Sequence, residues 1–236
     1  MMGYQKMTED YRQYPLVLLT ALLFFLLAVT SCAASDKTYG LLWEVNKAGA
    51  EPAYLFGTIH SEDPDVLQLA QPVQQAFTDS QTVVLEMLLD VDATRYSGAA
   101  MLLLEGRSLS DMIGQPLFSQ VATAMQSRGI TTTVLERMQP WAAAVVLSMP
   151  APETGQVLDA MLYQQALQQD KNVYGLETVQ EQLAVFESLS VADQVILLQD
   201  AVANFSEIDA MHAELLAAYK QRDLKKLMAI SDASMQ

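Results

Sequence analysis

Short apolar runs along the chain predict four β-strands. Residues 41–45 and 53–59 are two such runs, and the turn-forming stretch NKAGAEP between them predicts a β-hairpin. QTVVLEM, residues 81–87, is rich in β-branched side chains and predicts a third strand. KNVYGLET, residues 171–178, predicts a fourth strand that ends at an acidic residue.

Apolar residues at helical spacing fill the segments between and after these runs. Ser61 and Asp63 are cap-forming residues, and Pro64 follows them at an expected helix start. Residues 90–170 are predicted to be mostly helical, and residues 179–230 to contain two or three more helices. Strands separated by helices predict an α/β fold, with a mixed sheet and a large helical insertion or cap.

Within the predicted helical segment, two boundaries follow from single residues. A helix is expected to end at Gly129, because glycine readily adopts the left-handed conformation that closes helices. A second helix is expected to begin at Pro140, and it is apolar on all sides, which predicts burial. Neither a repeat nor an internal linker interrupts the pattern, so we expect residues 41–236 to form a single domain.

The first 32 residues have the pattern of an export signal. Residues 16–29 are fourteen residues without a charge, which suits a signal-peptide core and is short for a membrane span. Val29, Thr30, Ser31 and Cys32 then resemble a bacterial lipobox, so we expect lipidation at Cys32 and a short tether over residues 33–40. The alternative is a plain signal peptide cleaved at a small residue such as Ala33, with Cys32 there by chance.

Charge and cysteine content narrow the possible partners. The 236 residues contain 13 Lys and Arg against 28 Asp and Glu, a formal net charge of −15. That balance argues against nucleic acid and against electrostatic docking on anionic lipid. Because Cys32 is the single cysteine, no intrachain disulfide and no cysteine-based zinc site is possible. The thirteen methionines are spread along apolar faces and are expected to fill the core.

Three predicted strands end at residues that can carry chemistry: His60, Glu86 and Glu177. Ligands of open α/β sheets bind beyond the carboxyl ends of the strands. One imidazole and two carboxylates meeting there could bind a divalent cation such as Zn, Mn or Co, or act as general acid and base. Singly, however, an acid at a strand end is usually solvated or a helix cap, and Glu136 ends an apolar run in the same way.

The same segments resemble the TraB/GumN family, which is related to the TIKI metalloproteases. The resemblance is carried by YLFGTIH (residues 54–60), VVLEM (83–87) and YGLETVQEQLAVFESLSVADQ (174–194), in the family's order. It extends from about residue 40 to about residue 225 and implies a fold like that of the erythromycin-esterase/ChaN group. For TIKI-like members it implies metal-dependent peptide hydrolysis.

Residue by residue, the resemblance places His60 at the family's first GxxH histidine and Glu86 at the acid after the next strand. These two are the expected metal ligands, and Glu177 matches the acid of Gly-Leu-Glu-Thr, as a candidate general base. The chain departs from the family in having no second GxxH; its other histidine, His212, lies in an amphipathic pattern. We therefore expect either a C-terminally incomplete domain or a protein that has lost half its site.

Two functions remain open at this point. The first is a metal-dependent hydrolase acting on peptides or proteins, exported to the periplasm or outer membrane of a Gram-negative bacterium and held by an N-terminal lipid anchor. The second is a non-catalytic periplasmic lipoprotein that keeps the fold as a binding or accessory protein. The sequence assigns no oligomeric state.

Overall fold

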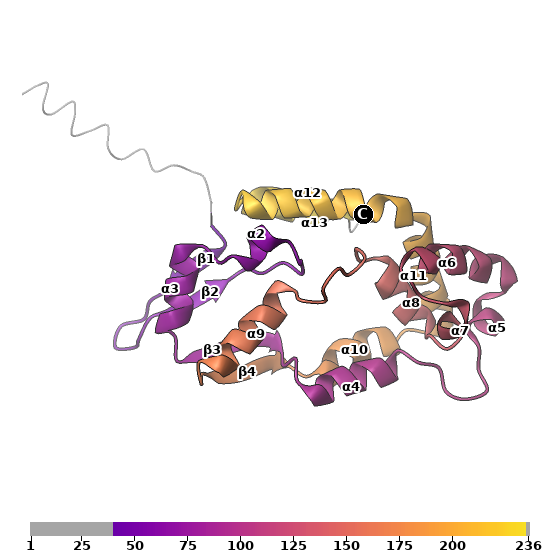
Figure 1. The fold of residues 1–236 in the computed structure, drawn as a ribbon, viewed down its shortest axis with the longest axis horizontal. Helices are drawn as coiled ribbons and strands as arrows, with labels where there is room; N and C mark the ends of the chain where they lie inside the picture. The colour runs from indigo at the N-terminus through magenta and orange to yellow at the C-terminus, as the bar shows by residue number, and fades with distance from the viewer. Residues whose placement is uncertain (1–39, 235–236) are drawn as a thin grey trace, which may run out of the picture. The chain divides into compact units, whose positions relative to one another are not determined.

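The computed structural model describes residues 40–234, which belong to one compact unit (Figure 1). The predicted signal segment and Cys32 lie outside the described residues. Among the described helices, none is long and apolar enough to cross a membrane.

The four predicted strands all form, but they pair in two separate sheets in the described part of the chain. Strands β1 (Leu42–Val45) and β2 (Ala53–Phe56) form the predicted antiparallel hairpin. Strands β3 (Thr82–Met87) and β4 (Asn172–Glu177) pair in parallel, with Met87 opposite Glu177. A two-plus-two arrangement therefore replaces the single mixed sheet that we expected.

Strand β2 is shorter than the apolar run that predicts it. The prediction extended to Ile59, whereas the strand ends at Phe56. The N–H of Gly57 still bonds the carbonyl of Leu41, at 2.7 Å, but no β1 residue lies beyond that pair to continue the ladder. The chain after Gly57 therefore leaves the hairpin, and His60 lies in a loop.

Helices make up most of the rest of the chain. After the hairpin come α2 (Pro64–Leu67) and α3 (Gln71–Asp79). Between β3 and β4 lie α4 (Val91–Ala100), α5 (Leu109–Ile113), α6 (Gln115–Ser127), α7 (Thr132–Leu135), α8 (Pro140–Leu147) and α9 (Leu158–Gln168). The chain ends with α10 (Val179–Glu187), α11 (Val191–Ala203), the 3-10 turn η1 (Phe205–Glu207), α12 (Ile208–Lys220) and α13 (Leu224–Ser234).

Local sequence explains several of these boundaries. Asp63 caps α2 by accepting the N–H of Asp65, and Pro64 occupies the first turn, as predicted. Gly129 has a φ of 73°, which only glycine adopts without strain, and α6 ends just before it. Thr178 and Glu181 form a capping box that starts α10 directly after β4.

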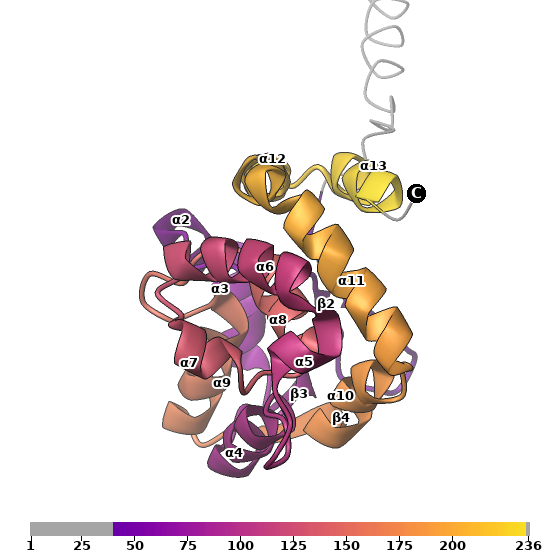
Figure 2. The same cartoon turned by 90° about the vertical axis from the view of Figure 1, so that its right-hand side faces the viewer.

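Two groups of buried residues hold the unit together. The larger group, the helical core, joins α5 to α8 and α11, which lie together in Figure 2, and includes Leu109, Met125 and Leu147 with no exposed surface. Helix α8 is buried on nearly all sides, as its apolar sequence predicted. Trp141 of α8 also stacks on Phe186 of α10, with ring centroids 5.3 Å apart.

The smaller group, the hairpin core, lies beneath β1 and β2. It is made of Leu41, Val66, Leu158, Leu162 and Tyr219. These residues come from β1's start, α2, α9 and α12, so segments distant in sequence meet here. Ile59, one residue before His60, packs against this core. The chain is thus a mixed α/β protein in which the hairpin core supports the loop carrying His60.

Candidate functional site on the loop from Gly57 to Asp65

His60 lies on the loop of residues 57–65, here called the histidine loop, which joins β2 to α2. Its side chain is exposed. Within the described part of the chain it has no hydrogen bond, ion pair or ring contact. Its neighbours on both sides are held firmly, Ile59 by the hairpin core and Ser61 by near-complete burial. A free imidazole is therefore presented on a fixed backbone.

The first anchor of the histidine loop comes from α12. The hydroxyl of Tyr219 donates a hydrogen bond to the carbonyl of Gly57, at 2.9 Å. Burial, with a contribution from the negative charge of Asp159, raises the pKa of Tyr219 to about 12. The hydroxyl therefore keeps its proton, and this bond persists, across the physiological pH range.

The second anchor comes from α9 and the turn before it. Thr58 donates its hydroxyl to Asp159 at 2.8 Å. Glu62 accepts the backbone N–H groups of Glu153, Thr154 and Gly155 and also the hydroxyl of Thr154. The bonds from Thr154 outweigh the small effect of burial and lower the pKa of Glu62.

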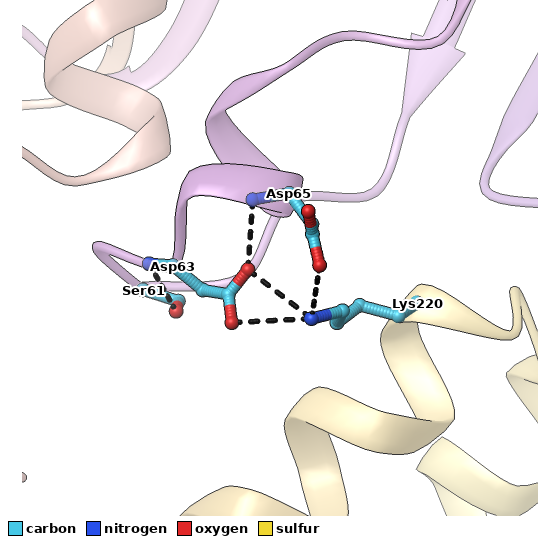
Figure 3. A network of polar contacts seen from close by, with 4 residues as sticks. All are labelled: Ser61, Asp63, Asp65 and Lys220. Carbon is cyan, nitrogen blue, oxygen red and sulfur yellow. Dashed lines mark hydrogen bonds and ion pairs between the residues drawn. The ribbon is translucent and has the colours of Figure 1, made fainter.

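The third anchor is an ion-pair network between α12 and the start of α2 (Figure 3). The ammonium of Lys220 contacts Asp63 at 3.2 Å and Asp65 at 2.5 Å. The two carboxylates, that of Asp65 first, raise the pKa of Lys220. Partial burial raises the pKa of Asp63, but the N–H of Asp65 and the charge of Lys220 leave that pKa lowered.

These anchors hold the histidine loop from two places, α12 on one hand and α9 with the turn before it on the other. Bonds at Gly57, Thr58, Glu62 and Asp63 bracket His60 closely in sequence. Fixing a reactive side chain in advance reduces the entropy lost when a ligand or substrate binds. The geometry therefore suits a binding or catalytic role for His60 better than a role in packing.

Glu86 and Glu177 lie on opposite faces of the β3–β4 pair. Residues directly opposite each other in a sheet share a face, and Glu177 is opposite Met87, one residue after Glu86. Glu86 accordingly lines a groove of about 490 Å³ together with Gly57, Thr58 and Asp159. Glu177 lines a separate cavity of about 300 Å³ with Asp90 and Glu181.

The structure thus brings Glu86 to the groove that the start of the histidine loop also lines, whereas Glu177 lies elsewhere. Both glutamates are exposed. Among residues 40–234, no group of three or more His, Cys, Asp or Glu side chains is close enough together to hold a metal ion. Metal binding at His60 and Glu86 remains a prediction.

The residues that hold the histidine loop were not found by sequence reasoning. Glu62 and Asp159 meet their partners across 91 or more residues of chain, and Lys220 lies 157 residues from Asp63. Among these residues, only Asp63 was recognised from the sequence, as a helix-capping residue before Pro64. Contacts of such sequence separation leave no local pattern to read.

Comparison with known proteins agrees with the sequence resemblance. No curated protein and no solved structure matches the chain. The profile of the TraB/PrgY/gumN family matches residues 41–236, a span that includes both strand pairs and the histidine loop. A match over so much of the sequence establishes that the chain belongs to the TraB/PrgY/gumN family.

Proposed function

We propose that the chain is a metal-dependent hydrolase that cleaves peptide bonds. The observation that carries the proposal is His60, an exposed imidazole with no partner among the described residues, on a loop held by three sets of bonds. Family membership and the resemblance to the TIKI metalloproteases support the reaction class. From the same resemblance we also propose that the fold is erythromycin-esterase/ChaN-like.

The proposed metal is Zn, Mn or Co. Such ions need three or more protein ligands in a catalytic site, and imidazole and carboxylate donors suit them. His60 and Glu86 supply two donors, and the described residues offer no ready group of three. This donor set does not complete a metal centre by itself.

The positions of His60, Glu86 and Glu177 define which residues can belong to the proposed centre. The three anchors fix the direction of His60, and Glu86 places a carboxylate on the wall of the adjoining groove. Glu177 was the candidate general base, but it lies on the other face of the β3–β4 pair. We therefore restrict the proposed centre to His60 and Glu86.

A second candidate function is that of a non-catalytic binding or accessory protein. The observation that favours it is the groove itself, which runs between β2 and β3 and is lined mostly by apolar residues. Binding without turnover, and binding that survives loss of His60, would distinguish this function from hydrolysis.

The metal proposal is tested by replacing His60. Calorimetric titration of the full chain, purified in detergent, should show weak binding of Zn, Mn or Co. His60→Ala should abolish that binding, because removing one ligand from a site with so few leaves too little affinity to detect. Glu86→Gln should also weaken metal binding, because it removes the second proposed ligand.

The matched control is His212→Ala, which removes the chain's other histidine from α12, where its side chain makes no bond to the histidine loop among the described residues. This variant should bind metal as the unaltered chain does. Equal binding by the His60→Ala variant, or no binding by any form at millimolar metal, would contradict the proposed centre.

We further propose export and lipid anchoring through Cys32, on the basis of the residue 29–32 lipobox pattern. In a Gram-negative host, Cys32→Ser should release the chain from the membrane fraction or block its processing, because the lipid is attached to the thiol. Ser35→Ala should fractionate normally. An unchanged mature mass and membrane fraction for Cys32→Ser would rule lipidation out.

A further inference from the structure

The groove beside the histidine loop runs along the edges of two strands. We call it the strand groove; it has a volume of about 490 Å³ and is walled by residues 54–58 on one side and 82–86 on the other. Helix α9 contributes Asp159 and Leu162, and α3 contributes Val73, Ala76 and Phe77. The two walls belong to different sheets, since β2 pairs with β1 and β3 with β4.

The residues of each wall are consecutive, which identifies the walls as strand edges. Successive side chains of a strand point to opposite faces, so a cavity over one face would touch alternate residues. The strand groove instead touches five residues in a row on β3, from Thr82 to Glu86, and three in a row on β2. It therefore borders the main chain of both strands.

On β3, the main-chain groups facing the strand groove can be assigned. The N–H of Asn172 bonds the carbonyl of Gln81, which sets the phase of the parallel ladder. In such a ladder, alternate residues direct both N–H and C=O to the partner strand. Odd-numbered residues of β3 therefore face β4, and Thr82, Val84 and Glu86 direct their N–H and C=O groups into the strand groove.

On β2 the same reasoning applies to the antiparallel ladder. The bond from Gly57 to Leu41 makes that pair a hydrogen-bonded one, and the pattern alternates along the strand. Tyr54 and Phe56 consequently direct their main-chain groups away from β1, into the strand groove. In the described part of the chain, no backbone partner outside the strand pairs is found for these groups or for their counterparts on β3.

Large apolar side chains are also uncovered at the strand groove. Leu55 is 63% exposed, Val84 52% and Leu176 75%, and all three line it. Exposed strand edges with apolar side chains are normally covered, because they pair readily with other chains. The combination of unpaired main chain and bare apolar side chains calls for an extended segment rather than a helix or a small ligand.

The charges on the walls are of one sign. Glu86 and Asp159 are the charged residues among those lining the strand groove, and no Lys, Arg or His lines it. A bound segment with a basic residue, or with its own terminal ammonium, would place a positive charge beside these carboxylates.

We propose that the strand groove binds an extended, basic peptide segment of another polypeptide as an additional strand between β2 and β3. Alternate residues of the peptide bond Tyr54 and Phe56 on one side and Thr82, Val84 and Glu86 on the other, as in any central strand of a sheet. The proposal rests on the strand groove alone and holds whether or not the bound peptide is hydrolysed.

The test uses a dye-labelled peptide of alternating valine and threonine with one terminal lysine, added to the full chain in detergent. Fluorescence anisotropy should report saturable binding. N-methylation of alternate peptide nitrogens, which blocks main-chain hydrogen bonds, should weaken binding about tenfold or more. Replacing the lysine by glutamate should weaken binding too, and Asp159→Asn should narrow the difference between the two peptides.

Variants of the chain test the strand edge itself. Val84→Pro removes an N–H that faces the strand groove and leaves the β4 ladder intact, so it should lose binding of the unmodified peptide. Glu44→Pro is the matched control, because Glu44 lies on the outer edge of β1 and outside the strand groove. It should bind the peptide normally.

Amide hydrogen exchange keeps the test decisive if Val84→Pro does not fold. Bound peptide should slow exchange at Tyr54, Phe56, Val84 and Glu86 in the unaltered chain. No binding at millimolar peptide, binding indifferent to N-methylation, or protection elsewhere would overturn the proposal. So would concentration-dependent dimerisation that protects these amides without peptide, since a second copy would then be the occupant. Metal titration of the His60→Ala variant is a separate experiment, so the metal-centre proposal and the peptide-binding proposal can fail independently of each other.

Discussion

A single carboxylate, that of Glu62, joins the histidine loop to a turn 91 residues further along the chain. It accepts three backbone N–H groups and one hydroxyl from residues 153–155. Backbone donors converging on a carboxylate stabilise its charged form. Much of the fixed position of His60 therefore depends on a residue that takes no part in the proposed chemistry.

Glu62→Gln should loosen the histidine loop. The amide replaces one accepting oxygen by an NH2 group, which cannot accept the N–H groups now bound there. We expect a lower melting temperature and faster amide exchange over residues 57–63, measured on the full chain. Glu51→Gln is the control, because Glu51 is exposed and has no partner in the described part of the chain. Equal effects of both substitutions would contradict the anchoring role.

The lowered pKa values of Glu62 and Asp63 predict how stability responds to acid. A carboxyl with a lower pKa in the folded state stabilises it fully above its unfolded pKa, about 4.3 for Glu and 3.9 for Asp. This stabilisation is lost as the pH falls through the folded values. Denaturant unfolding at pH 7, 5, 4 and 3 should show the unaltered chain and Glu62→Gln converging below about pH 4. A difference that stays constant down to pH 3 would exclude the linkage.

Residue by residue, the sequence predicted short-range features and missed long-range ones. Asp63, Pro64 and Gly129 were recognised because caps and helix ends depend on neighbouring residues. Glu136 ends an apolar run as Glu86 does, yet it follows helix α7 and accepts the N–H of Ser110. An acid after an apolar run is therefore ambiguous until the backbone is known.

At the scale of elements, α12 fastens the histidine loop through two adjacent residues. Tyr219 bonds Gly57, and Lys220 pairs with Asp63 and Asp65. The tyrosine bond is largely shielded from water, whereas the ion pairs are partly exposed and are weakened by salt. The tyrosine is consequently the stronger of the two connections.

Tyr219→Phe isolates this connection, because it removes the hydroxyl and keeps the ring in the hairpin core. Loss of the bond to Gly57 should cost about 1 kcal/mol of unfolding free energy. Faster amide exchange in the histidine loop should accompany it. Tyr163→Phe is the matched control, since Tyr163 is also buried but its hydroxyl has no partner in the described part of the chain. An equal loss in both variants would mean that the bond to Gly57 contributes nothing.

The sequence pattern predicts where the strands lie but not how they pair. All four were predicted, because β-branched and apolar residues mark them; the bounds are correct to within one residue for β1, β3 and β4, whereas β2 ends at Phe56 rather than at Ile59. Which strand pairs with which was not predicted, since strand pairing depends on contacts between segments that are distant in sequence. The opposite orientation of Glu86 and Glu177 follows from register, and a shift of one residue would have placed both on one face.

At the scale of the whole described unit, two buried cores have different consequences for the site. The helical core packs α5 to α8 and α11 around residues such as Leu147. The hairpin core packs Leu158, Val66 and Tyr219 directly beneath Ile59 and the histidine loop. Packing defects are felt most by the groups that touch them. The site should therefore respond to damage in the hairpin core more than to equal damage in the helical core.

Two leucines of equal burial allow this comparison. Leu147 lies in the helical core and Leu158 in the hairpin core, and neither exposes any surface. Either leucine-to-alanine change should cost about 2–5 kcal/mol, through lost transfer free energy and the cavity left behind. Leu158→Ala should in addition speed amide exchange of residues 57–62 under native conditions, because the support of Ile59 is weakened. Leu147→Ala should leave local exchange there unchanged once global unfolding is subtracted. Equal acceleration by both variants would show that the two cores act on the histidine loop as one.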